Sequence, residues 1–487
     1  MKKAVLRMIA GALVLMLLLS AAACRSSGKP GSSSSGNSLK KYALASAAYP
    51  DLPEVPDHQS MMEKLNALDH SKLGEQYYTR YDAIVSDYQK KLDKYQTVLQ
   101  EFKAAGTADP QYTAALSDYT DRTAAQIFHE YKGRNIVFSP SNFFLALSML
   151  AETTGTESRE ELLQLIGVPT VEEARSLSNA VFRTTYRLDG AGRTLLANSL
   201  WLSDALQYHQ EVADVLAKEH FASSYTVPMG KEETDLAVRQ WIDDNTANLL
   251  EDASAGIHLP DNTVAALVST LYFKDNWRSP FSETKTSGAD FTDRDGTKHI
   301  TLCMHKDLAE STAFHSEEGH YTVSALPFES GASMVFLLPD EGVSLDELLE
   351  KQLVTKALLT FSDPEQQEPS HVKWLVPKFD IDADLSLIDT LKALGVTSIF
   401  DETTSDFSPL LASEDAEPVT VSTVKHAARV KVSEEGCEAA AFTLITPTYA
   451  SLPPELPIVE MYLNRPFAFM ITGLDGLPLF IGIVNYV

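Results

Sequence analysis

The chain has 487 residues, and 40 Lys and Arg stand against 67 Asp and Glu, which gives a net charge of −27. Such acidity excludes a nucleic-acid binder, whose surface must be basic, and indicates a well-solvated surface. Hydrophobic residues make up 44% of the chain, enough for a large core, and three cysteines are too few for a disulfide framework.

The first 23 residues have the pattern of a secretory signal peptide. Lys2, Lys3 and Arg7 are basic, the run Met8–Leu19 is apolar, and small residues precede Cys24. We therefore expect this segment to be removed from the mature protein and to take no part in the fold.

Residues 24–39 are rich in Ser and Gly, which is typical of a flexible tether. The segment before them resembles a bacterial lipoprotein signal, in which Cys24 would be the lipidated first residue. Ala21 stands where such signals usually have Leu, and a plain signal peptide is the alternative. The resemblance implies an extracellular protein anchored to the cell membrane as a lipoprotein.

Residues 40–111 form an N-terminal extension. Its first part, as far as His70, contains three prolines and is expected to be irregular. From Ser71 to Ala105, apolar residues recur at intervals of three and four, which predicts an amphipathic helix: Tyr77, Tyr81, Ile84, Tyr88, Leu92, Tyr95, Leu99 and Phe102. Such a helix can pair with another chain, but more often it packs on its own domain, as we expect here.

Two helices are predicted next. One covers Tyr112–Tyr131, and a buried one follows the end of a strand at Ser139-Pro140. Ser282-Glu-Thr-Lys285 fits a Ser-x-x-Lys nucleophile pattern, but the chain has no Lys-Thr-Gly partner. We treat that match as chance and do not expect an enzyme.

The most informative stretch lies near residue 436. Val430 and Val432 alternate with polar residues, as in a half-buried strand, and Gly436 permits a change of backbone direction. If the residues after Gly436 form a central strand, the inward set is small and uncharged: Cys437, Ala439, Ala441, Thr443 and Ile445. The outward set is Glu438, Ala440, Phe442, Leu444 and Thr446. Alone, the alanines would also suit a short helix.

Glu434, Glu435, Gly436, Glu438 and Ala439–Ala441 closely resemble the hinge of inhibitory serpins. About a dozen further landmarks keep that family's order, among them Ser139-Pro140, Ala197–Trp201, Trp241–Thr246, Thr270–Trp277, Val376–Phe379, Asn464–Phe467 and Leu479–Gly482. The resemblance implies an α+β fold with three β-sheets, about nine helices and an exposed reactive-centre loop. It assigns residues 112–487 to a serpin domain, a monomer that needs no cofactor or metal.

The resemblance also implies where a protease would cut. The fifteenth residue counted from Gly436 is Ala450, so the reactive bond is Ala450–Ser451, and a slip of one residue would place Tyr449 before it. Alanine suits an elastase-like serine protease and tyrosine a chymotrypsin-like one. Residues 438–461 contain no Lys or Arg, which excludes a trypsin-like target.

The family's central sheet carries a polar cluster of Ser, Asn and His, which corresponds here to Asn142, Ser269 and His426. Cys437 replaces the usual Thr of the hinge, and Asp275 stands where the family has Gly. We expect a suicide-substrate inhibitor that traps the acyl-enzyme by inserting its cleaved loop into the central sheet. The alternative is a non-inhibitory serpin acting as a cell-surface binding protein.

Overall fold

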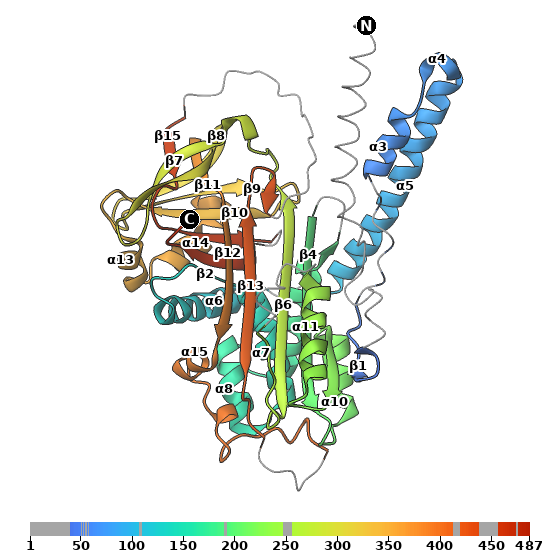
Figure 1. The fold of residues 1–487 in the computed structure, drawn as a ribbon, viewed down its shortest axis with the longest axis vertical. Coiled ribbons are helices and arrows are strands. Elements are labelled where there is room, and N and C mark those ends of the chain that lie inside the picture. The colour runs from blue at the N-terminus through green and yellow to red at the C-terminus, as the bar shows by residue number, and fades with distance from the viewer. Residues whose placement is uncertain are drawn as a thin grey trace.

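The computed structural model places the chain in two sheets and the helices around them (Figure 1). It describes residues 39–49, 51, 53, 56, 58–106, 110–188, 192–246, 256–412, 419–437, 456–473 and 476–487. The predicted signal peptide, most of the tether with Cys24, and the loop segment 438–455 with the bond Ala450–Ser451 lie outside the described residues.

The central sheet has the strand order β1-β5-β4-β6-β14-β13-β12, and β3 pairs with β4. Its strands are β1 (Ala43–Ala45), β3 (Arg187–Leu188), β4 (Gly192–Ser203), β5 (Ala222–Val227), β6 (Ala265–Asn276), β12 (Phe379–Ser386), β13 (Val424–Val432) and β14 (Gly436–Cys437). Buried and exposed residues alternate along β12 and β13, as period-two strands require.

The second sheet has the order β15-β11-β8-β9-β10-β16-β17-β2, and β7 pairs with β8. Its strands are β2 (Ile136–Phe138), β7 (Ser287–Thr292), β8 (Lys298–Ser316), β9 (Tyr321–Pro327), β10 (Ser333–Pro339), β11 (Glu368–Pro377), β15 (Ile458–Tyr462), β16 (Phe467–Thr472) and β17 (Pro478–Val484). We predicted three sheets; the described strands join into two, because the 19-residue β8 pairs with β7 and β11 along one part and with β9 along another.

From Pro110 onward the described residues contain nine α-helices, in line with the prediction: α6 (Pro110–Glu130), α7 (Pro140–Thr153), α8 (Thr156–Ile166), α9 (Val171–Thr185), α10 (Gln210–Glu219), α11 (Glu232–Thr246), α13 (Leu345–Glu350), α14 (Val354–Phe361) and α15 (Ile388–Ala393). Helix α7 is buried along its whole length. It contacts both sheets, since Ser141 Oγ donates to the carbonyl of Pro478 (2.6 Å) and Ser139 N–H to His426 Nε2 (2.9 Å).

The N-terminal extension contains α3 (His58–Asn66), α4 (His70–Leu73) and the 29-residue α5 (Gln76–Ala104). Together they project from the body (Figure 1). The predicted amphipathic helix is observed, but α5 begins at Gln76 rather than at Ser71, and the C-terminal part of its stripe packs on the body. Tyr95 is buried, and Phe102 makes edge contacts with Tyr186 and Phe221.

The segment before α3 is not wholly irregular, contrary to our expectation. β1 adds to the edge of the central sheet beside β5, and Tyr49 stacks on Tyr186. Leu39, which we placed at the end of the tether, is buried with Trp201 and Tyr225. Among the described residues, no helix is both long and apolar enough to cross a membrane.

Candidate functional site: the hinge and the central sheet

The resemblance places the hinge at the end of β13, and there the chain makes a tight reversal. Ser433 N–H donates to the carbonyl of Gly436 (3.0 Å), and Val432 pairs with Cys437 in antiparallel register. Trp277, which is not part of the turn, holds it by two hydrogen bonds. Its backbone N–H donates to the carbonyl of Glu435 (2.8 Å), and its indole Nε1–H donates to the carbonyl of Ser433 (2.9 Å).

Glu434 anchors this turn from within the protein. Its carboxylate is buried, lies 2.9 Å from Lys378 Nζ and accepts a hydrogen bond from Thr286 Oγ1 (2.9 Å). Burial alone would raise the pKa of Glu434, but these contacts outweigh burial and lower the pKa. The carboxylate is therefore held in its ionised form by the partners that fix the turn. Its carbonyl also accepts from Phe281 N–H (2.8 Å).

Gly436 is required for close approach. A Cβ at this position would lie 2.1 Å from Asp275 O and 2.7 Å from Asn276 Cα, so a side chain would push β14 away from β6. We had expected the glycine to permit the change of direction. The reversal is made by Ser433–Glu435 instead, and Gly436 is already part of a strand.

Cys437 is the first hinge residue inside the sheet, and its residue surface is 2% exposed. It pairs with Asp275 of β6 on one side and Val432 of β13 on the other, both buried. Asp275, for which the sequence offered no explanation, lies 3.6 Å from the guanidinium of Arg187. An ion pair thus compensates the carboxylate beside the thiol.

β14 enters the sheet between β6 and β13 at one end of those strands. At the other end the two strands pair directly and in parallel, with Val424 opposite Leu267, Lys425 opposite Val268 and His426 opposite Ser269. The pairing of β6 with β13 is therefore direct at one end and passes through β14 at the other.

The predicted polar cluster lies where the direct pairing begins. Ser269 Oγ donates to Asn198 Oδ1 (2.8 Å) and approaches the carbonyl of Asn142 (3.4 Å), whereas His426 Nε2 accepts from Ser139 N–H. Burial lowers the pKa of His426 to about 4, so the ring is neutral.

The side chain of Asn142 does not form the hydrogen bond expected of it in this cluster. The resemblance places Asn142 and Ser269 in one cluster, but the Ser269 side chain bonds Asn198, and both side-chain amide atoms of Asn142 lack a hydrogen-bond partner among the described residues. Within the described ranges, His426 Nδ1 and Asn198 Nδ2 are likewise buried without a hydrogen-bond partner. Asn198 was missed, although it lies in a stretch that matched the family's pattern.

The sequence model of the family described as Serpin (serine protease inhibitor) matches residues 114–487. The chain belongs to the serpin family. Serpin-Z1C of Triticum aestivum is 28% identical over 363 residues, which is 72% of this chain and 90% of that protein. Antichymotrypsin-2 of Bombyx mori is 27% identical over 375 residues, 76% of this chain and 96% of that protein.

Solved serpin structures show the same fold. The native state of tengpin, a thermophilic serpin, matches with a TM-score of 0.70 at 22% identity, over 78% of this chain and 95% of tengpin. The native stressed conformation of an Arabidopsis serpin matches with a TM-score of 0.68 at 23% identity, over 78% and 99% of the two chains. The predicted α+β serpin fold is confirmed.

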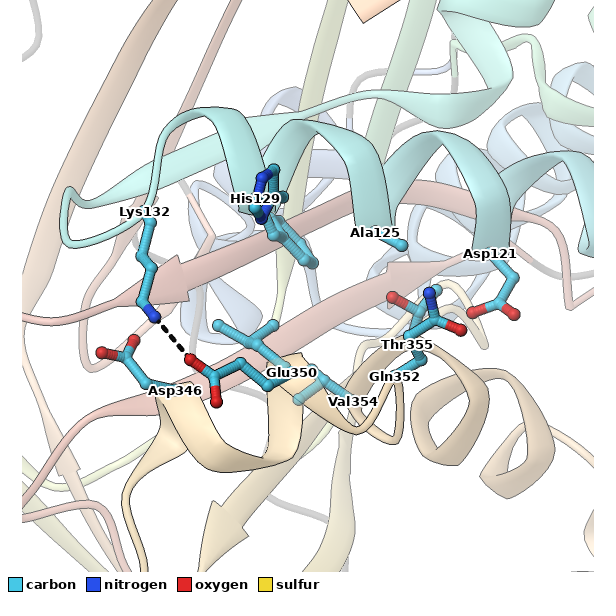
Figure 2. A pocket seen from close by; sticks show the side chains of 11 residues that line it. Asp121, Ala125, His129, Lys132, Asp346, Glu350, Gln352, Val354 and Thr355 are labelled. Carbon is cyan, nitrogen blue, oxygen red and sulfur yellow. Dashed lines mark hydrogen bonds and ion pairs between the residues drawn. The ribbon is translucent and has the colours of Figure 1, made fainter. Parts of the chain in front are cut away.

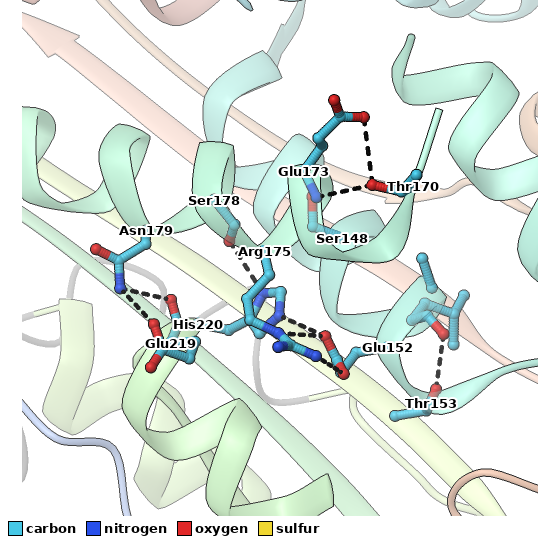
Figure 3. A network of polar contacts seen from close by, with 12 residues as sticks. Ser148, Glu152, Thr153, Thr170, Glu173, Arg175, Ser178, Asn179, Glu219 and His220 are labelled. Carbon is cyan, nitrogen blue, oxygen red and sulfur yellow. Dashed lines mark hydrogen bonds and ion pairs between the residues drawn. The ribbon is translucent and has the colours of Figure 1, made fainter. Parts of the chain in front are cut away.

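The serpin contains a Ser-His-Glu contact that resembles a catalytic arrangement (Figure 3). His220 Nδ1 lies 3.0 Å from Ser178 Oγ, its Nε2 lies 3.4 Å from Glu152, and Arg175 binds Glu152 through two nitrogens. Burial alone would raise the pKa of Glu152, but His220 and Arg175 lower it to about 2. Ser178 and His220 are fully buried, so no substrate reaches them, and the network joins helices instead.

A pocket between α6 and the α13–α14 region does not indicate a catalytic or ligand-binding site either (Figure 2). Its volume is about 140 Å³, below the roughly 300–1,000 Å³ of most small-molecule sites. Lys132 at its rim is paired with Glu350 at 2.8 Å. The described residues contain no group of three or more His, Cys, Asp and Glu side chains that could hold a metal ion.

Proposed function

We propose that this serpin is a suicide-substrate inhibitor of a serine protease, and that its cleaved loop inserts between β6 and β13. The observation that carries the proposal is the position of β14. Gly436 and Cys437 already occupy the place of an additional strand, antiparallel to both neighbours. The inserted strand would be their continuation.

The register supports this path in detail. Cys437 lies opposite residue 275 of β6 and residue 432 of β13, so each further loop residue would lie opposite the preceding residue of both strands. Thr443, six residues on, would then lie opposite Ser269 and His426, which now pair with each other. The residues as far as Phe442 would fill the space before that pair, and Thr443 would have to separate it.

The chemistry follows from where the loop is cut. A serine protease would attack the carbonyl of Ala450 and form an acyl-enzyme, releasing a peptide that begins at Ser451. Insertion of about 15 residues at about 3.3 Å each would carry the acylated protease roughly 50 Å. Strain on the acylated serine would distort the protease's catalytic site, and deacylation would stop because it needs that geometry.

The specificity follows from Ala450 and the absence of Lys and Arg in residues 438–461. Incubation with elastase-like, chymotrypsin-like and trypsin-like proteases, followed by denaturing gels and mass spectrometry, tests the proposal. We expect a complex that survives denaturation with the elastase-like enzyme and a released peptide that begins at Ser451. A peptide beginning at Ala450 would move the bond to Tyr449 and favour a chymotrypsin-like target. Cleavage without any stable complex would contradict inhibition.

We also propose that the mature protein is extracellular and held at a bacterial membrane by lipid on Cys24, because basic, apolar and small residues precede that cysteine. In a bacterial host, Cys24→Ala should move the protein from the membrane fraction to the soluble secreted fraction. Unchanged partitioning of Cys24→Ala would contradict the anchor.

A further inference from the structure

A second pocket, of about 510 Å³, lies beside the hinge and is large enough for a small organic molecule. Its wall is formed by residues of β8, β9, β10 and the end of α14, together with the turn that follows β6. Trp277, which holds the hinge turn by two hydrogen bonds, is one of the lining residues.

Two cations, Lys306 and Arg278, line this pocket. Among the described residues, no carboxylate lies within ion-pair distance of Lys306 or Arg278. Glu310 is the one carboxylate among the lining residues, and its side chain is exposed. Lys306 Nζ lies 4.4 Å from the centroid of the Phe281 ring, a contact that compensates only part of the lost hydration.

The half-buried position of Lys306 disfavours its charge. Burial lowers the pKa of this ammonium to about 8. A partly buried cation without a counterion is costly, and an anion bound beside it would relieve that cost.

The rest of the wall offers both carbon and polar surface. Leu308, Leu326, Val335 and Phe361 supply carbon surface, whereas six serine and threonine residues and Gln367 add polar groups. A pocket with carbon walls and a cationic side favours a ligand with an apolar body and one acidic group.

We propose that this pocket binds a small organic anion, whose acidic group is held by Lys306 and Arg278 and whose apolar body lies against Leu308, Val335 and Phe361. A carboxylate, sulfate or phosphate group would meet the same two cations. The proposal is independent of protease inhibition, because binding itself is the quantity measured.

Isothermal titration with octanoate and octyl sulfate, and with 1-octanol as the uncharged control, tests the proposal on the intact protein. We expect saturable binding of one molecule of either anion and about tenfold or more weaker binding of the alcohol. Lys306→Met and Arg278→Gln should each weaken binding of the anions by about tenfold or more. Lys285→Gln, which removes an exposed cation outside the pocket, should leave binding unchanged.

A second measurement uses the wild-type protein alone, so it does not depend on whether a variant folds. Because the bound anion stabilises the protonated ammonium, octanoate should cause proton uptake at pH 8.5, seen as a dependence of the heat on the buffer's ionisation enthalpy. Absence of saturable binding, equal binding of octanol and octanoate, or wild-type binding by both Lys306→Met and Arg278→Gln would overturn the proposal. Binding of the anions without proton uptake would show that Lys306 is not their partner.

Discussion

His426 is a neutral histidine at the point where β6 and β13 meet. Its Nε2 must stay unprotonated to accept the hydrogen bond from the Ser139 N–H, and no carboxylate pairs with the ring in the part of the chain that the structure describes. A charge on this ring would be buried where β13 pairs with β6, and the proposed insertion would separate that pair. Protonation of His426 at low pH should therefore destabilise the native central sheet.

The sign follows from the lowered pKa. Between pH 6.5 and about 4, the unfolded chain binds a proton at His426 that the native state does not. The free energy of unfolding should therefore fall with falling pH in this window, by roughly 3 kcal/mol from this group. Denaturant unfolding at pH 7 and pH 4 measures the loss, and His426→Gln should remove that part of it. Equal pH dependence of the two proteins would contradict the account.

Thr443 is the loop residue that the register brings to the polar cluster. In the inserted loop its hydroxyl would lie between Ser269 and His426, near the side-chain amide of Asn142, whose atoms have no hydrogen-bond partner among the residues that the structure describes. Thr443→Val should therefore cost the cleaved form about 1 kcal/mol of stability. Thr446→Val, on the outward face, is the matched control and should cost less. The two cleaved variants are compared by denaturant unfolding, and equal losses would mean that the register is different.

At the scale of elements, the patterns predicted those whose signal is local. The stripe of α5, the buried α7 after Ser139-Pro140 and the alternation of β13 all follow from periodicity and capping, and all are observed. β1 could not be predicted, because an alanine-rich segment has little strand preference and forms a strand only where the edge of β5 is available.

The sequence predicted most of the residues that form the site, but not all the contacts that those residues make. The hinge residues stand out by their composition, whereas the turn at Ser433–Glu435 and the close approach of Gly436 depend on Trp277 and β6, which lie far away in the chain. Asn198 was missed for the same reason. Whether it or Asn142 meets Ser269 depends on the spacing of strands and helix in three dimensions.

The hinge turn should keep Cys437 from reacting while its fastening to Lys378 and Thr286 is intact. Glu434→Gln removes the ion pair, and alkylation of Cys437 should become about tenfold faster because local opening costs less. Glu435→Gln is the neighbouring control and should react as the wild type does. Mass spectrometry resolves Cys437 from the buried Cys303, whose reaction reports global unfolding. Equal rates at Cys437 in the two variants would contradict the anchoring role.

At the scale of the whole molecule, the described part of the central sheet already contains the two residues from which the proposed inserted strand would continue. Two residues of β14 lie between β6 and β13, and the direct pair of those strands lies six positions further on. Beside that pair, buried polar atoms of Asn142 and His426 have no hydrogen-bond partner in the described part of the chain. A sheet in this condition should gain stability when the loop is cut and can move in.

One pair of variants tests insertion most directly, because it changes the same loop on its two faces. Ala439 belongs to the inward set that continues from the buried Cys437, and a buried unpaired charge there would cost about 3 kcal/mol or more. Ala440→Glu places the same charge on the outward face. The measurement is the ratio of stable protease complex to cleaved inhibitor for Ala439→Glu, Ala440→Glu and the wild type.

The account predicts that Ala439→Glu becomes mainly a substrate, because the protease hydrolyses the acyl-enzyme before the loop can carry it away. Ala440→Glu should form nearly as much complex as the wild type. Equal ratios for Ala439→Glu and Ala440→Glu would contradict insertion between β6 and β13. A wild type that is cleaved without forming any stable complex would be a non-inhibitory member of its family.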